Sequence, residues 1–100
     1  MIKHVVMWRL KEKVEGNTKE YNALEIKKQI EALKDKVDEV IDLEVGINFE
    51  ESSQAYDIIL YSTFKSKEDL DNYQNNEEHL KVVKFIKEVV EERVVVDYRV

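Results

Sequence analysis

Two stretches of this chain, residues 2–10 and 56–64, carry apolar side chains at both odd and even positions. Successive side chains of a β-strand point to opposite faces of its sheet, so each stretch predicts a strand that is covered on both faces. Residues 40–49 instead alternate apolar with polar side chains, which is typical of an edge strand with one wet face. The chain is therefore predicted to build a sheet around two central strands.

Helical segments separate these strands. Apolar residues recur at spacings of three and four over residues 18–36, which predicts an amphipathic helix that starts near Asn17. Ser66 and Asp69 form a capping pattern for a short helix that runs through Tyr73. Asn76 is predicted to cap a further helical segment over residues 77–91, and a last strand is predicted over residues 93–100.

The order of these elements is strand, helix, strand, strand, helix, strand. With right-handed crossovers, this order gives a ferredoxin-like βαββαβ fold of the α+β class, with an antiparallel four-stranded sheet and the helices on one of its faces. One hundred residues are enough for one such domain, and we expect it to span residues 1–100.

The sheet face away from the helices is predicted to be apolar. Five side chains would be exposed together on it: Val5, Met7, Ile59, Tyr61 and Val95. A contiguous apolar patch of this kind marks an interaction surface. We therefore expect a homodimer in which two sheets pack face to face and close a dimeric α+β barrel.

Composition excludes several classes of function. The chain has no cysteine, which excludes disulfides and thiol chemistry, and its two glycines are too few for a glycine-rich phosphate loop. A net charge of −6, with Lys and Arg interspersed among Glu and Asp, argues against a nucleic-acid partner. No apolar run is long enough to span a membrane and no signal-peptide layout is present, so we expect a cytoplasmic protein without a membrane partner. No residue pattern indicates a cofactor.

The chain has only two histidines, His4 and His79. His4 lies in the first predicted strand, on the same face as Trp8, and His79 lies in the first turn of the helix over residues 77–91. Imidazole titrates near neutral pH and suits proton transfer. The histidines and Asp57 lack the close spacing of metal ligands, so no metal site is predicted.

Three stretches together resemble the stress-responsive A/B barrel (Dabb) family of the dimeric α+β barrel superfamily. They are residues 3–10, residues 56–64, and a C-terminal half that contains residues 73–80, 85–86 and 96–98. The resemblance covers nearly the whole chain and implies the same fold and homodimerisation. The family includes plant stress proteins that form higher oligomers and bacterial proteins linked to catabolic operons. One plant branch cyclises linear polyketides by intramolecular aldol condensation.

The resemblance also implies a site. The cyclase branch uses a tyrosine and a histidine whose spacing matches Tyr73 and His79, and its opening-strand histidine matches His4. A neutral His79 could take a proton from a carbon next to a carbonyl, while the Tyr73 hydroxyl donates to the oxygen that becomes negative. The structural alternatives are a Tyr73 that closes its helix against the core, a His79 that satisfies backbone groups, and a His4 that is simply buried and hydrogen-bonded.

The sequence departs from the family pattern at two places. Asn76 and Glu77 replace a His-Pro pair, and no histidine occurs in the third strand near Asp57 or Ile58. These departures argue against polyketide cyclisation itself.

Two hypotheses of different classes follow, and the residues leave open whether the protein is an enzyme. In the first, it binds or transforms a small carbonyl-bearing molecule in an apolar pocket between sheet and helices. His79 and Tyr73 would be the catalytic residues, and His4 and Trp8 would bind the ligand. In the second, it is a non-catalytic stress or accessory protein that acts through its oligomeric assembly. A roomy cavity between His4 and His79 would count against the second hypothesis, and a sealed, packed space would support it.

Overall fold

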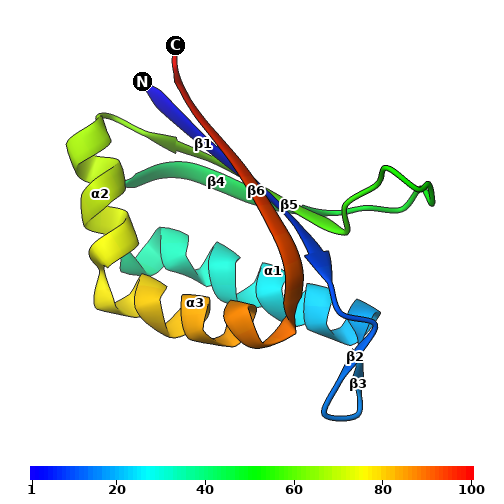
Figure 1. The fold of residues 1–100 in the computed structure, drawn as a ribbon. Coiled ribbons are helices and arrows are strands. Elements are labelled where there is room, and N and C mark those ends of the chain that lie inside the picture. Colours follow the sequence, from blue (N-terminus) through cyan, green and yellow to red (C-terminus); the bar gives the residue numbers. More distant parts are fainter.

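The computed structural model describes residues 1–100 and places three helices against one face of a four-stranded sheet (Figure 1). In chain order, the elements are β1 (Ile2–Leu10), β2 (Lys13–Val14), β3 (Asn17–Thr18), α1 (Lys19–Lys36), β4 (Val40–Ile47), β5 (Ile58–Phe64), α2 (Lys67–Asn75), α3 (Glu77–Val89) and β6 (Val90–Arg99).

The strand order in the main sheet is β4-β5-β1-β6, and every neighbouring pair is antiparallel. The central strands are β1 and β5, the two that the two-sided apolar patterns predict. The predicted ferredoxin-like fold is therefore confirmed. Because β1 and β6 are antiparallel neighbours, the two termini lie side by side, and the N-terminal amine donates to the Val100 carbonyl at 3.2 Å (Figure 1).

The hydrophobic core lies between the sheet and the helices. The even-numbered residues of β1, from Ile2 to Leu10, all face it and are all buried. Helix α1 contributes Ala23, Ile26, Ile30 and Leu33, whose spacings of three and four put them on one stripe. Helices α1 and α3 run beneath the sheet, and α2 stands at one end of it (Figure 1).

Each helix begins where a side chain satisfies one of its free backbone N–H groups. Thr18 and Ser66 each accept from the N–H three residues ahead, at 3.2 and 3.1 Å, and Asn76 accepts from the N–H two residues ahead at 2.8 Å. Because Thr18 rather than Asn17 caps α1, that helix starts one residue later than predicted. None of the three helices combines the length and apolar character needed to cross a membrane.

A short hairpin, β2–β3, lies between β1 and α1 and is not among the predicted elements. Its two-residue turn consists of Glu15 and Gly16, with φ values of 51° and 86°. Positive φ at both central residues is the pattern of a type I′ turn, which glycine favours and which matches the twist of a hairpin. The sequence signal is weak because only one of the two positions is a glycine.

The register of β6 corrects the prediction for Val95. Strand β6 begins at Val90, directly after α3, and pairs Val95 with Val6, so the Val95 side chain lies on the helix side of the sheet. Val94 and Val96, which pair with Met7 and Val5, lie on the open face instead. A shift of one residue moves every side chain of a strand to the other face, and a bulge opposite Arg9 and Leu10 sets this register.

The open face of the sheet is apolar along its middle. It carries alternate residues of β1, β5 and β6, of which the apolar ones are Val5, Met7, Ile59, Tyr61, Val94, Val96 and Tyr98. We call this set the open-face patch. Met7, Ile59, Tyr61, Val96 and Tyr98 are exposed there in the single chain.

Candidate functional site

The junction between α2 and α3 brings Tyr73 and His79 together. In a continuous helix, residues six apart point to different sides and are separated by about 9 Å of rise. Asn76 interrupts the helix at this point. Its backbone N–H donates to the Tyr73 carbonyl and ends α2, and its side chain caps the start of α3. The chain bends there, and the Tyr73 and His79 rings come to 4.4 Å between centroids.

The same junction fixes the tautomer of His79. Nδ1 of His79 lies 3.1 Å from the Gln74 carbonyl oxygen. A carbonyl can only accept, so Nδ1 carries the hydrogen and Nε2 is left as the basic atom of the neutral ring.

The surroundings of His79 favour that neutral ring. Burial lowers the pKa of His79 below its ordinary value of 6.5, the hydrogen bond to Gln74 opposes this, and the positive charge of Arg93 and the neighbouring His4 lower the pKa further. His79 is therefore an uncharged base at neutral pH.

Tyr73 is packed between two aromatic rings, and its hydroxyl is free to donate a hydrogen bond. Its side chain is 1% exposed and packs between the rings of Phe64, at 4.9 Å, and His79. Burial raises the pKa of Tyr73 far above its ordinary value of 10.0, so the hydroxyl keeps its proton. No hydrogen bond within the protein engages that hydroxyl.

His4 is fixed by the strand next to it. It lies opposite Asp97 of β6, and its Nδ1 is 2.5 Å from Oδ1 of Asp97. On the other side, the His4 backbone carbonyl accepts a hydrogen bond from the buried Ser62 hydroxyl at 2.7 Å. A carboxylate accepts from Nδ1–H, so Nε2 of His4 is the ring atom left for other partners.

These side chains share one cavity of about 360 Å³ between the sheet and the helices. A volume near the lower end of the range for ligand sites suits a small molecule. Nine of its 14 lining residues are hydrophobic. The cavity is lined by His4, Val6, Trp8, Ile30, Leu60, Tyr73, Gln74, His79, Val82, Val83, Ile86, Lys87, Val90 and Arg93.

All four site residues singled out from the sequence, namely His4, Trp8, Tyr73 and His79, line this cavity. Three polar lining residues were not predicted from the sequence, namely Gln74, Lys87 and Arg93. Arg93 could have been found from the sequence. Strand alternation puts it on the same face as Asp97, the partner of His4. Gln74 and Lys87 depend on how the helices pack and leave no such signal.

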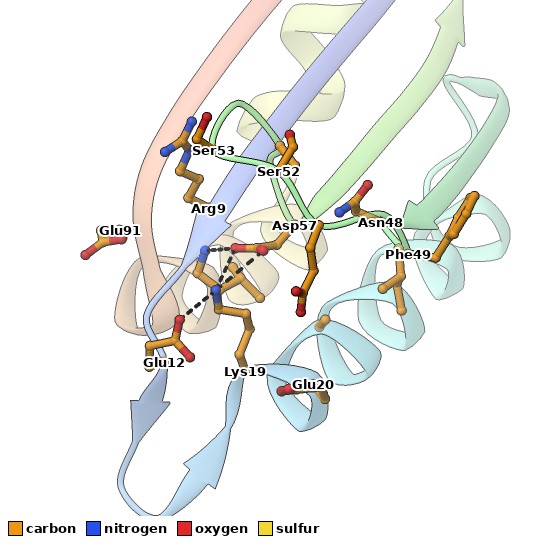
Figure 2. Close-up of a pocket in the computed structure, with 15 residues that line it drawn as sticks. Arg9, Glu12, Lys19, Glu20, Asn48, Phe49, Ser52, Ser53, Asp57 and Glu91 are labelled. Carbon is orange, nitrogen blue, oxygen red and sulfur yellow. Dashed lines mark hydrogen bonds and ion pairs between the residues drawn. The ribbon is translucent and has the colours of Figure 1, made fainter.

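A second, larger hollow of about 800 Å³ lies beside the loop between β4 and β5 (Figure 2). At its centre, Asp57 accepts from the Leu10 N–H at 2.8 Å and pairs with Lys19, which also pairs with Glu12. Asp57 therefore tethers β1 to α1 rather than joining either histidine. No group of three or more His, Asp or Glu side chains in the structure is arranged to hold a metal ion.

Comparison with known proteins agrees with this architecture. The sequence model of the Stress responsive A/B Barrel Domain, Dabb, matches residues 2–100. The chain belongs to the stress-responsive A/B barrel family. No functionally curated protein matches this family member significantly.

Solved structures with the same fold as this A/B barrel protein include proteins of several kinds. A dimeric protein of unknown function from Bacteroides fragilis is 32% identical, with a TM-score of 0.88 over 99% of this chain and 95% of that one. A dimeric ferredoxin-like protein from Thermobifida fusca is 17% identical, with a TM-score of 0.84 over 99% and 90%. A hydroxynitrile lyase from Passiflora edulis is 20% identical, with a TM-score of 0.81 over 97% and 90%.

Proposed function

We propose that this A/B barrel protein binds a small carbonyl-bearing molecule in the cavity between its sheet and helices, and that His79 and Tyr73 act on it. The observation that carries the proposal is the meeting of an uncharged imidazole and an unpaired phenol hydroxyl in one largely apolar cavity. Apolar walls with a few convergent polar groups are the usual composition of a small-molecule site.

The chemistry that fits these two groups is proton abstraction next to a carbonyl. Nε2 of His79 takes a proton from the carbon beside the carbonyl, the electrons of that C–H bond form a C–C double bond, and the carbonyl oxygen becomes an enolate. The Tyr73 hydroxyl, which burial keeps protonated, donates a hydrogen bond to that oxygen. In this proposal, Trp8 and His4 shape the wall that holds the substrate.

The cavity favours this proposal over a purely structural role for the protein. An assembly protein without a ligand would have no use for a hollow between His4 and His79, and burying more apolar surface there would stabilise it. About 360 Å³ is left open there instead. The hydroxynitrile lyase with the same fold also supports small-molecule chemistry on this scaffold, by analogy of fold alone.

We propose further that the protein works as a homodimer through its open-face patch. The 32% identical relative and the Thermobifida fusca neighbour are both dimeric proteins. Packing two sheets face to face would cover the exposed Met7, Val96 and Tyr98 of each subunit. The cavity lies on the opposite, helix side of the sheet, so each subunit would keep its own complete site.

Exchange of hydrogen for deuterium at the carbons beside the carbonyl of 2-octanone tests the proposed chemistry directly. In D2O, the wild-type protein should accelerate this exchange. NMR measures the rate as the signals of those protons disappear. His79→Ala should lower the rate by about 100-fold or more, which is the usual contribution of a general base. Tyr73→Phe should lower it by about 100-fold through loss of the oxyanion donor.

Leu80→Ala is the matched control, because Leu80 is an exposed neighbour of His79 on α3 that lies outside the cavity lining. Its exchange rate should equal that of the wild type. Trp8 is the only tryptophan and lines the cavity, so its fluorescence reports binding independently. A fluorescence change with no accelerated exchange would remove the catalytic role of His79 and leave a binding protein. No change in either measurement would refute the proposal.

A further inference from the structure

The charges that line the cavity are all of one sign. Lys87 and Arg93 are among its lining residues, and no Asp or Glu is. The hollow beside Asp57 is the opposite case, with five acidic and two basic residues in its lining. The chain as a whole carries a net charge of −6, so a cavity without a carboxylate stands out against its own surface.

Neither cation of the cavity is neutralised by the protein. Lys87 and Arg93 take part in none of the ion pairs of the structure. The carboxylate that touches a lining side chain is Asp97, and it is already engaged by Nδ1 of His4. The two positive charges therefore remain available to a ligand.

Lys87 and Arg93 are the only exposed residues of the cavity lining, so their charges lie at its solvent side. Lys87 is in the last turn of α3, and Arg93 is on β6 directly opposite Trp8, hence on the helix side of the sheet. Both residues are exposed, whereas Tyr73 is buried. The charge of Arg93 nevertheless reaches His79, whose pKa it lowers. A single small molecule can thus contact a cation at the opening and the Tyr73–His79 pair deeper inside.

We propose that the molecule bound here carries an anionic oxygen group, a carboxylate or a phosphate, which Arg93 and Lys87 hold at the opening while its carbonyl faces Tyr73 and His79. This inference rests on the proposed function and specifies its substrate class as acidic carbonyl compounds. The planar guanidinium of Arg93 suits two parallel hydrogen bonds to such a group, and Lys87 adds a second point charge.

Binding of a matched set of ligands tests the inference. The probes are 7-oxooctanoate, its neutral analogues 7-oxooctanamide and 2-octanone, and the ketone of the same chain length that ends in a phosphonate. Trp8 fluorescence and calorimetry give the affinities. The acid should bind the wild type about tenfold or more tightly than either neutral ketone, as expected for hydrogen bonds to a charged group. The tighter binder of the acid and the phosphonate identifies which anion the site takes.

Arg93→Gln should abolish the preference for the acid over the neutral ketones, and Lys87→Gln should reduce that preference. Lys84→Gln is the matched control, because Lys84 is an exposed cation on the same helix that does not line the cavity. It should leave the preference intact.

The NMR titration of His79 gives a readout that a merely structural Arg93 would not move. A bound anion offsets the nearby positive charge, so the acid should raise the pKa of His79. The neutral 2-octanone carries no charge and should lack this effect. Equal binding of acid and neutral ketones would overturn the anion inference and leave the proposed function standing. Failure of all the probes to bind would overturn both.

Discussion

At the scale of single residues, the site depends on hydrogen bonds that fix proton positions. The Gln74 carbonyl fixes the hydrogen of His79 on Nδ1, and Asp97 does the same for His4. Nε2 of each ring therefore has no hydrogen-bond partner within the protein, and in the neutral ring of His79 it is the basic atom. A site with this arrangement needs no rearrangement of its own protons before it can accept one from a ligand.

The titration of His79 is a direct test of this environment. Because burial and the charge of Arg93 lower the pKa of His79, its NMR midpoint should lie below 6.5 in the wild type. Arg93→Gln should raise the midpoint, since it removes a positive charge that opposes protonation. The His79→Gln variant lacks the His79 signal and therefore assigns the resonances of the two histidines. A wild-type midpoint above 6.5 would contradict the account.

The same shift makes stability depend on pH with a definite sign. In the unfolded chain His79 titrates near 6.5 and in the folded protein it titrates lower, so the unfolded state binds more protons between the two values. The stability contributed by a neutral His79 is therefore complete above pH 6.5 and is lost as pH falls through that window. Urea unfolding of the wild type and His79→Gln at pH 7 and pH 5 should show the wild type losing more stability on acidification.

At the scale of elements, Asn76 controls the geometry of the site. It ends α2 and caps α3, so it sets the bend that places Tyr73 against His79. The family resemblance leads us to expect a histidine at this position, but a capping side chain is what the bend requires here.

Substitution of Asn76 should show this role. Asn76→Ala should cost about 1 kcal/mol of stability, the typical effect of losing an N-cap, and Asn76→Ser should restore most of it. Asn75→Ala serves as the neighbouring control, because Asn75 is exposed and bonds only back into α2. Chemical denaturation gives the free energies. An Asn76→Ala variant as stable as the wild type would show that the junction is held by packing alone.

The elements also show what the sequence could and could not predict. Periodicity identified the central strands, because two covered faces leave an apolar pattern of their own. It failed for Val95, because a register slip of one residue is invisible in a run of consecutive valines from Val94 to Val96. His79 was singled out as one of only two histidines, and the family resemblance added Tyr73. Lys87 was not found, because a cavity is a property of how helices pack and has no sequence period.

At the scale of the whole molecule, the two faces of the sheet have different proposed roles. The helix side holds the cavity, and the open-face patch is the surface through which we propose dimerisation. This division predicts that the two functions can be separated by mutation.

Val95 and Val96 make a matched pair for that test. They are adjacent on β6, point to opposite faces, and are 47% and 55% exposed. Val96→Glu should convert the dimer to a monomer, because a charge would be buried in the interface without a partner. Val95→Glu should leave the dimer intact. Sedimentation at micromolar concentration gives the result, and a wild-type monomer or the reverse pattern would refute the proposed interface.

The central claim is that the cavity between sheet and helices receives a carbonyl compound. A crystal structure of the wild-type protein with 2-octanone tests it most directly. We predict density for the ketone between Trp8 and His79, with its oxygen at hydrogen-bond distance from the Tyr73 hydroxyl. Density confined to the hollow beside Asp57, or a cavity closed by its own side chains, would contradict it.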